Sequence, residues 1–253
     1  MPSHRNHRFS SVSVVHSWSK FASLGSLLAV VGWFTLADTS FVSSQEKSTA
    51  KPDAKTVKAD EEGWKSLFDG KKLGNWKVTE FGGQGRVQVE EGNLVLGIGD
   101  GCTGVTWKGD LPFPTIDYEL SLEAMRVEGT DFFCGLTFPV GESPCSLICG
   151  GWGGGVVGLS SLDGEDAANN ETTKYIEFKS KKWYPIKLRV TKEKIEAWID
   201  GKQEVDVETK DRKISVRIEV DASRPLGICS WNTKAALRNI KVRPLKAEAK
   251  SSK

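Results

Sequence analysis

The feature that most constrains this chain is a two-residue alternation of apolar and polar side chains, repeated in short runs. In the run IDYELSLEA every second residue is apolar, and Asp, Glu or Ser stand between them. Successive side chains of a strand point to opposite faces, so this run predicts a strand with one buried face. Similar runs such as KYIEF, PIKLRV and KISVRIEV recur, separated by Gly, Pro, Asn and Asp. Many short strands without a helical period predict an all-β antiparallel sandwich or jelly roll of two sheets.

One hairpin can be predicted in register. In DFFCGLTFPVGESPCSLIC two apolar runs flank a turn that we place between Gly141 and Glu142. The facing pairs are then Cys134 with Cys149, Leu136 with Leu147, and Phe138 with Cys145. All are apolar and share one face, which supports the register. Opposed Cβ atoms lie about 4.5–5.5 Å apart, and a disulfide prefers roughly 3.5–4.5 Å. We therefore predict that Cys134 and Cys149 are core neighbours, leave their oxidation state open, and expect the other cysteines to be buried thiols.

The N-terminal segment predicts export. Residues 1–20 carry basic side chains and no acid, and residues 21–37 are uncharged and mostly apolar. This apolar core is shorter than the roughly 20 residues of a membrane span and is typical of a secretory signal. We predict that residues 1–44 are a signal peptide, with an uncleaved anchor as the alternative. The rest of the chain would then be periplasmic or secreted, with no stable membrane span after cleavage.

The composition of residues 45–253 separates a domain from two flanking segments and excludes some kinds of partner and catalytic group. Residues 45–62 and 246–253 are charged and poor in large apolar side chains, which predicts a flexible linker and a disordered tail around a domain at 63–245. Lys and Arg number 35 and Asp and Glu 33, so a formal charge of +2 gives no electrostatic case for a nucleic-acid partner. All three histidines (His4, His7, His16) precede the domain. Histidine bases, nucleophile pairs with histidine and histidine metal ligands are therefore excluded from it.

Four segments in order carry a resemblance to a known family. They are GWKSLFDGKKLGNWKV at 63–78, IDYELSLEAMR at 116–126, WYPIKLRVTKEKIEAWIDGKQ at 183–203 and LRNIKVRPL at 237–245. The first resembles the opening of the 3-keto-disaccharide hydrolase-like domain family. The others are similar to its Asp-x-Glu-Leu strand ending in Arg, its strand hairpin and its closing Arg-Asn-Ile motif. The resemblance implies a concanavalin A-like jelly roll that binds a small saccharide or glycan and cleaves glycosides oxidised at C3.

The middle of the chain departs from the family pattern. The family has Asn-Ser-Gly after the arginine strand and a Glu-x-Gln downstream, where this chain has FFCGLTFP and CSLICGGWGGG. The fold therefore carries over better than the activity. Two alternatives stay open beside an enzyme, namely a non-catalytic carbohydrate-binding module on the same fold and a structural protein of the cell envelope.

Without histidine, any catalysis must use carboxylates, lysine, tyrosine or cysteine, and a carboxylate or a desolvated lysine could serve as the base. A 3-keto sugar has an acidic C2 proton, so β-elimination needs one base and a stabiliser for the enolate. We take Asp131, Glu177 and Asp163 as candidates, because Glu177 points off the core and the other two lie at strand ends or in loops.

Two tryptophans are the candidate substrate-binding residues, because sugars stack on aromatic faces. Trp152 stands in GGWGGG, where glycines leave its ring open, and Trp231 stands between Ser230 and Asn232. No metal ligand set or cofactor motif is identified, although the loop DGEDAANNE at 163–171 leaves room for a calcium ion.

Overall fold

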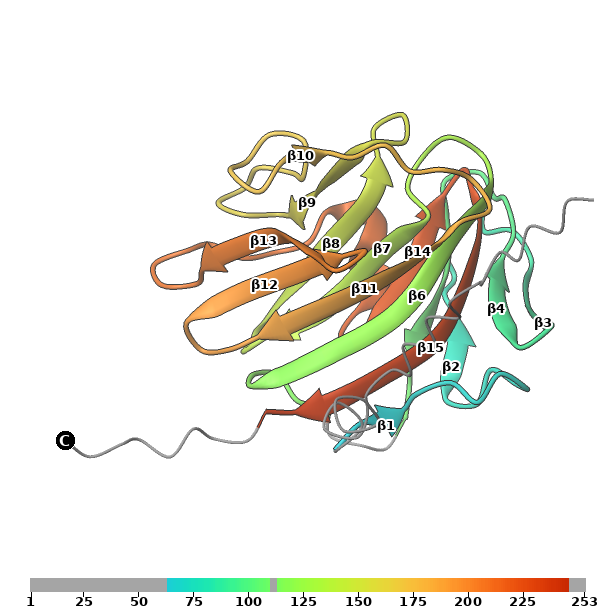
Figure 1. The fold of residues 1–253 in the computed structure, drawn as a ribbon, viewed down its shortest axis with the longest axis horizontal. Helices are drawn as coiled ribbons and strands as arrows, with labels where there is room; N and C mark the ends of the chain where they lie inside the picture. Colours follow the sequence, from blue (N-terminus) through green and yellow to red (C-terminus); the bar gives the residue numbers. More distant parts are fainter. Residues whose placement is uncertain (1–62, 110–112, 246–253) are drawn as a thin grey trace, which may run out of the picture. The chain divides into compact units, whose positions relative to one another are not determined.

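The computed structural model describes residues 63–109 and 113–245, and the predicted signal peptide, linker and tail lie outside the described residues. Two antiparallel sheets make up the described part, with one short 3-10 helix, η1 (Ile218–Ser223). Figure 1 shows the sheets one behind the other, with β12, β11 and β6 in front of β8, β7 and β14. The predicted all-β jelly-roll sandwich of two antiparallel sheets is confirmed.

The eight-stranded sheet has the order β13-β12-β11-β6-β15-β4-β3, and β1 pairs with β15. Its strands are β1 (Lys65–Ser66), β3 (Val87–Glu90), β4 (Asn93–Leu96), β6 (Tyr118–Glu128), β11 (Trp183–Val190), β12 (Lys194–Ile199), β13 (Lys202–Glu208) and β15 (Lys234–Pro244). The seven-stranded sheet has the order β10-β9-β8-β7-β14-β5-β2. Its strands are β2 (Trp76–Val78), β5 (Cys102–Trp107), β7 (Cys134–Val140), β8 (Ser143–Gly151), β9 (Val156–Ser160), β10 (Lys174–Tyr175) and β14 (Gly227–Trp231).

The main core lies between the sheets, where the alternation places it. In β6 the side chains of Tyr118, Leu120 and Leu122 are at most 1% exposed, and they join one apolar cluster with Leu136 and Leu147 of the other sheet. Non-directional burial of apolar area is the dominant stabilising contribution in such a sandwich. The polar residues between them in β6 face away from this core.

The predicted hairpin register is confirmed residue by residue. β7 and β8 pair Cys134 with Cys149, Leu136 with Leu147, and Phe138 with Cys145. All five cysteines are free and buried, so Cys134 and Cys149 are neighbouring thiols in the core. A one-residue slip would have turned the whole apolar set to the opposite face, which is why a single face fixed the pairing.

The alternating run at 213–220 is a correction to the prediction. It is not a ladder strand: Ile214 forms an isolated bridge with Leu162, and the run ends in η1. Val216 and Val220 pack on an apolar patch below, whereas Arg217 and Glu219 form an ion pair. The segment lies across an apolar sheet surface with Val216 and Val220 turned toward it, which gives part of the period of a half-buried strand, whereas Ile218 is 88% exposed.

Candidate functional site

The outer face of the seven-stranded sheet carries a second, smaller apolar cluster. Its buried members are Cys102, Phe132, Ile148, Val156, Ala167, Val220 and Cys229. Ala167 lies in the loop after β9 and Val220 in η1, so both segments cover part of this face. The close approach requires glycine: a Cβ on Gly158 would lie 2.8 Å from the Ala167 carbonyl oxygen, and one on Gly227 would lie 2.5 Å from that of Ser223.

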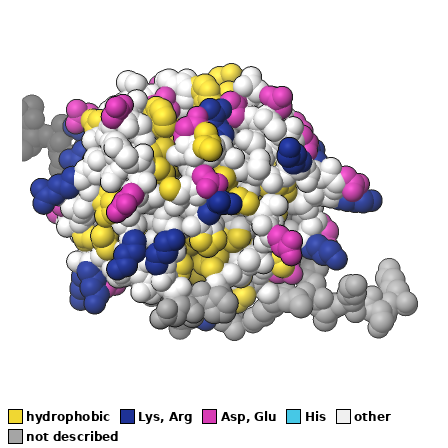
Figure 2. Space-filling view, turned by 180° about the vertical axis from the view of Figure 1, so that it is seen from behind, with side chains coloured by type: hydrophobic (Ala, Val, Ile, Leu, Met, Phe, Trp, Pro, Cys, Tyr) yellow, Lys and Arg dark blue, Asp and Glu magenta, His cyan; other side chains and the backbone are white. Residues whose placement is uncertain are grey.

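Where the two covering segments leave the sheet open, a cavity of about 200 Å³ remains. Its floor is formed by Ser146, Ile148 and Ser160 of β8 and β9, and Phe132 and Val220 add apolar wall. Asp131, Trp152, Arg217, Glu219 and Trp231 complete the lining. On the molecular surface seen from behind, hydrophobic side chains reach the surface in clusters between charged ones (Figure 2). Concave apolar sites with a few polar groups are the usual form of small-ligand sites.

The two predicted tryptophans lie in the lining of this one cavity. Trp152 follows a bulge in the β8–β9 ladder, has a positive φ of 47°, and keeps 45% of its surface exposed. Trp231 ends β14, and its ring centroid lies 6.3 Å from that of Phe132. One ring is thus open to solvent, and the other is supported from beneath. Both can present a face to a sugar ring.

Arg126, at the end of β6, holds the backbone beneath Trp152. Its Nη2 donates to the carbonyl oxygens of Gly154 at 2.8 Å and Gly150 at 3.3 Å, and its Nη1 donates to that of Phe178 at 3.4 Å. A Cβ on Gly150 would lie 2.5 Å from Nη2, so the run of glycines lets the guanidinium reach these carbonyls. Burial lowers the pKa of Arg126, and the charge of Asp131 opposes that shift. The arginine is only 5% exposed, and its Nε has no hydrogen-bond partner.

Asp131 is fixed at the cavity between β6 and β7. Its Oδ1 accepts a hydrogen bond from the Phe132 backbone N–H at 2.7 Å, and its own N–H donates to Thr233 Oγ1 at 3.1 Å. Oδ2 accepts only a long bond of 3.4 Å from the Gly153 N–H. The carboxylate therefore has one firmly held oxygen and one that a ligand can approach.

The remaining charged groups of the cavity form an ion pair. Arg217 Nη2 lies 2.6 Å from Glu219 Oε1, and Arg217 Nη1 lies 2.8 Å from Asp166 Oδ2. The hydrogen bond from Arg217 lowers the pKa of Glu219, which favours the ionised carboxylate and makes it a weaker base. Ser160, Arg217 and Glu219 were missed by sequence reasoning. The only signal for the two charged residues was their place between apolar residues in the run 213–220.

The other two predicted carboxylates lie elsewhere. Glu177 is exposed in the segment between β10 and β11 and does not line the cavity. Asp163 occupies a turn with a positive φ of 53°, where its Oδ1 accepts from the Lys213 N–H and its Oδ2 pairs with Arg212 at 2.8 Å. Of the three candidates, only Asp131 is beside the tryptophans.

Three acidic side chains of the loop at 163–171, the loop considered for a calcium ion, form ion pairs with arginines. Asp163 and Glu171 both pair with Arg212, and Asp166 pairs with Arg217. Across residues 63–109 and 113–245, no group of three or more His, Cys, Asp or Glu side chains converges in a way that could hold a metal ion. Among these same residues no helix is long and apolar enough to cross a membrane.

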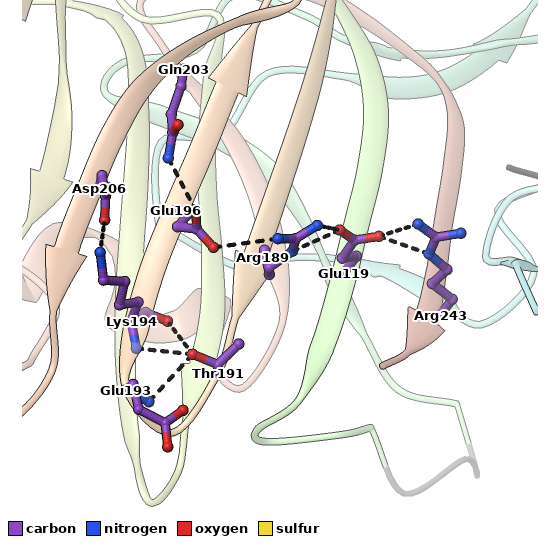
Figure 3. A network of polar contacts seen from close by, with 9 residues as sticks. All are labelled: Glu119, Arg189, Thr191, Glu193, Lys194, Glu196, Gln203, Asp206 and Arg243. Atoms are coloured by element: carbon purple, nitrogen blue, oxygen red, sulfur yellow. Dashed lines mark hydrogen bonds and ion pairs between the residues drawn. The ribbon is translucent and has the colours of Figure 1, made fainter. Parts of the chain in front are cut away.

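A polar network on the outer face of the eight-stranded sheet is a separate feature (Figure 3). Glu119, with a side chain 0% exposed, lies between Arg189 at 2.8 Å and Arg243 at 2.6 Å. Burial by itself raises the pKa of Glu119, but the hydrogen bonds and charges of the two arginines outweigh it and lower the pKa overall. The guanidinium groups also lie over the rings of Trp198 and Trp64. A carboxylate that is enclosed and neutralised in this way has a structural role.

Comparison with known proteins gives a family and a fold. The model of the 3-keto-alpha-glucoside-1,2-lyase-like domain family matches residues 63–243. None of the curated proteins compared with the chain matches it.

Three solved structures are similar at low identity. The Crh5 transglycosylase in complex with NAG is 15% identical, with a TM-score of 0.50 over 74% of this chain and 85% of that one. A candidate glycosyl hydrolase from Parabacteroides distasonis is 15% identical, with a TM-score of 0.46 over 75% and 97%. Carbohydrate binding module CBM66 from Bacillus subtilis is 12% identical, with a TM-score of 0.43 over 67% and 95%.

Proposed function

The chain belongs to the 3-keto-alpha-glucoside-1,2-lyase-like domain family, and on this premise we propose that its cavity binds and cleaves 3-keto-glycosides. The observation that carries the proposal is the meeting of Trp152, Trp231 and the approachable oxygen of Asp131 at one cavity on the outer sheet face. Family membership makes it a carbohydrate-active protein. The oxidised substrate and the residue roles are our proposal.

The size of the cavity favours one sugar ring inside it. About 200 Å³ is below the roughly 300–1,000 Å³ of sites that enclose drug-sized ligands. The 3-keto ring would lie on the floor against Trp231, and the leaving group would extend past the exposed ring of Trp152. This arrangement leaves the leaving group in partial contact with solvent, where it can take up a proton.

In the proposed reaction Asp131 is the base. It removes the C2 proton, which is acidic because the resulting carbanion is delocalised onto the C3 carbonyl oxygen as an enolate. The enolate electrons then form the C1–C2 double bond and restore the ketone, while the C1–O bond breaks and the leaving group departs. Addition of water to the unsaturated product would complete a net hydrolysis. None of these steps needs histidine, in keeping with the histidine-free domain.

The experiment uses the full chain with 3-keto-trehalose, whose leaving group is glucose, and glucose release is followed. Asp131→Asn should lower turnover by roughly 10²–10⁴-fold, the usual contribution of a positioned base. Asp163→Asn is the matched control, because it makes the same change in a turn outside the cavity. Equal turnover in wild type and Asp131→Asn would contradict the proposed base.

A non-catalytic binding module is the second candidate, and one observation favours it. Glu219, the other carboxylate of the cavity, is neutralised by Arg217, so the site lacks a second free acid. Binding of both the 3-keto sugar and its unoxidised parent, without glucose release, would select this alternative.

Location and domain limits complete the proposal. We propose that residues 1–44 direct export to the periplasm or outside the cell and that 63–245 is the working domain. Mass spectrometry of the exported protein would test this, because a mature N-terminus that retains residues 1–44 would contradict cleavage.

A further inference from the structure

A row of hydroxyl groups runs across the outer sheet face from β7 to β9, and its Ser146 and Ser160 members line the cavity. Thr137 and Ser146 are paired in register, and so are Ser146 and Ser160. The Thr137 and Ser146 hydroxyl oxygens lie 2.8 Å apart and share a hydrogen bond. Ser160 ends the row on β9 and is among the residues that line the cavity.

The Ser160 hydroxyl differs from its neighbours because it has no partner. The residue is 1% exposed, and its Oγ makes no hydrogen bond within the protein. A buried hydroxyl without a partner is costly, and such groups in folded proteins call for an explanation. Here its position offers one, since the residue lines the cavity and its hydroxyl has a free donor that can turn toward a ligand bound there.

We propose that Ser160 Oγ donates a hydrogen bond to the C3 carbonyl oxygen of the bound 3-keto sugar and stabilises the enolate oxygen that forms there. The inference rests on the proposed function and adds the group that the elimination lacks, a donor aimed at the developing negative charge. When Asp131 takes the C2 proton, the electron pair of the C2–H bond forms the enolate. Its oxygen then accepts the Ser160 hydrogen bond more strongly than the ketone did. Ser160 itself neither gains nor loses a proton.

Arg217 is the cationic donor of the lining, and its surroundings make it a poorer choice. Its guanidinium already donates to both carboxylate oxygens of Glu219 and to Asp166. Turning to an enolate would require those bonds to break. The Ser160 hydroxyl needs only to rotate, so the cost of reorganisation at the moment of reaction is small.

The test is Ser160→Ala in the full chain, with Ser160→Thr as the variant that keeps the hydroxyl. With 3-keto-trehalose, Ser160→Ala should lower kcat by roughly 10²–10³-fold, the usual effect of losing one such donor. KM should change far less, and Ser160→Thr should recover part of the rate. Thermal stability of Ser160→Ala should stay equal or rise, because the change removes an unsatisfied buried group. A merely structural serine would show the opposite, with a lower melting temperature and an unaffected kcat in the molecules that remain folded.

Ser223→Ala is the matched control. Its hydroxyl is also buried, beside the Cys229 thiol, but it does not line the cavity. It should leave kcat unchanged. Turnover by wild type together with an unchanged kcat in Ser160→Ala would overturn the role of Ser160 and leave the proposed function intact.

If wild type releases no glucose, a binding experiment tests the Ser160 contact separately from the proposed cleavage. The dissociation constants of 3-keto-trehalose and trehalose are then compared by calorimetry. Preference for the keto sugar in wild type, lost in Ser160→Ala, would support the carbonyl contact even though the elimination had failed. Equal affinities of wild type for the two sugars, or no binding of either, would overturn the inference.

Discussion

Replacing Arg126 by Met should loosen the loop that carries Trp152. Methionine keeps the length and apolar stem of the side chain and removes the guanidinium. The change takes away the donors to Gly150, Gly154 and Phe178 and leaves the two glycine carbonyls buried without that partner. The fold outside the loop should persist, since the methionine side chain can fill the space beside Phe133, where the Arg126 guanidinium carbon now lies 5.3 Å from the ring centroid.

The size of the effect follows from the three contacts. A hydrogen bond from a charged donor contributes about 1.5–3 kcal/mol, and only the 2.8 Å bond to Gly154 has good geometry. The bonds at 3.3 and 3.4 Å are weaker. Against this loss stands the relief of a guanidinium whose burial lowers its pKa and whose Nε is unpaired. We expect a net destabilisation of about 2–4 kcal/mol.

Two measurements check the prediction. Urea unfolding gives the change in the free energy of unfolding, and acrylamide quenching of tryptophan fluorescence in the native state reports whether Trp152 has become more accessible. The control is Arg238→Met, on the neighbouring strand β15 of the same sheet. Arg238 also lies over an aromatic ring, that of Trp183, but it is 39% exposed and pairs with Glu123. It should cost no more than about 1 kcal/mol.

Equal stability of Arg126→Met and Arg238→Met, with unchanged quenching, would refute the claim that Arg126 holds the loop. Saccharide affinity provides a second check, because a displaced Trp152 should lose its stacking contact. An Arg126→Met protein that is less stable but binds sugar with the affinity of wild type would show that Arg126 stabilises the fold without positioning Trp152 for the ligand.

The remaining predictions concern three other parts of the molecule. Glu119→Gln should destabilise the protein by about 2–4 kcal/mol at pH 7, measured by urea unfolding, because it breaks an enclosed ion pair. Since the folded pKa of Glu119 lies below its ordinary 4.5, the difference from wild type should persist above that pH and disappear as pH falls through the lowered value. Trp152→Ala and Trp231→Ala should each weaken sugar binding by about 1–3 kcal/mol in calorimetry, and unchanged affinity in both would remove the stacking site. Native protein should resist thiol alkylation, because all five cysteines are buried and burial raises the pKa of Cys145 to about 12; five labels after unfolding, counted by mass spectrometry, would show that no disulfide forms.

The fold was predictable because its signals are local. The alternation in β6 fixes which side chains face the core, and the turn at Gly141 fixes how β7 meets β8. The run at 213–220 shows the limit of this reasoning. Alternation indicates that some side chains on one side of a segment meet an apolar surface. For a strand of the sandwich that surface is the core between the two sheets, whereas for this run it is the outer face of a sheet that the segment lies across.

The candidate site was predictable only in part, for the same reason. Trp152 and Trp231 were marked by small or polar neighbours that leave a ring open, and Asp131 by its place at the end of a strand. Ser160 gave no signal, because an unpaired hydroxyl is defined by what surrounds it in three dimensions. Glu177 and Asp163 had the same local character as Asp131, and only the tertiary structure separates them from it.

The departure of FFCGLTFP and CSLICGGWGGG from the family pattern has a physical consequence in this fold. These two segments supply β7 and β8, whose outer face here carries Ile148 and other apolar or small side chains over much of the cavity floor. The polar side chains that β8 and β9 contribute to the lining are the hydroxyls of Ser146 and Ser160, and the charged groups of the lining come from connecting segments instead. Asp131 precedes β7, and Arg217 and Glu219 belong to the segment that crosses the sheet. We expect a site built in this way to depend also on how its loops are held down, as Arg126 holds the Trp152 loop through the Gly150 and Gly154 carbonyls.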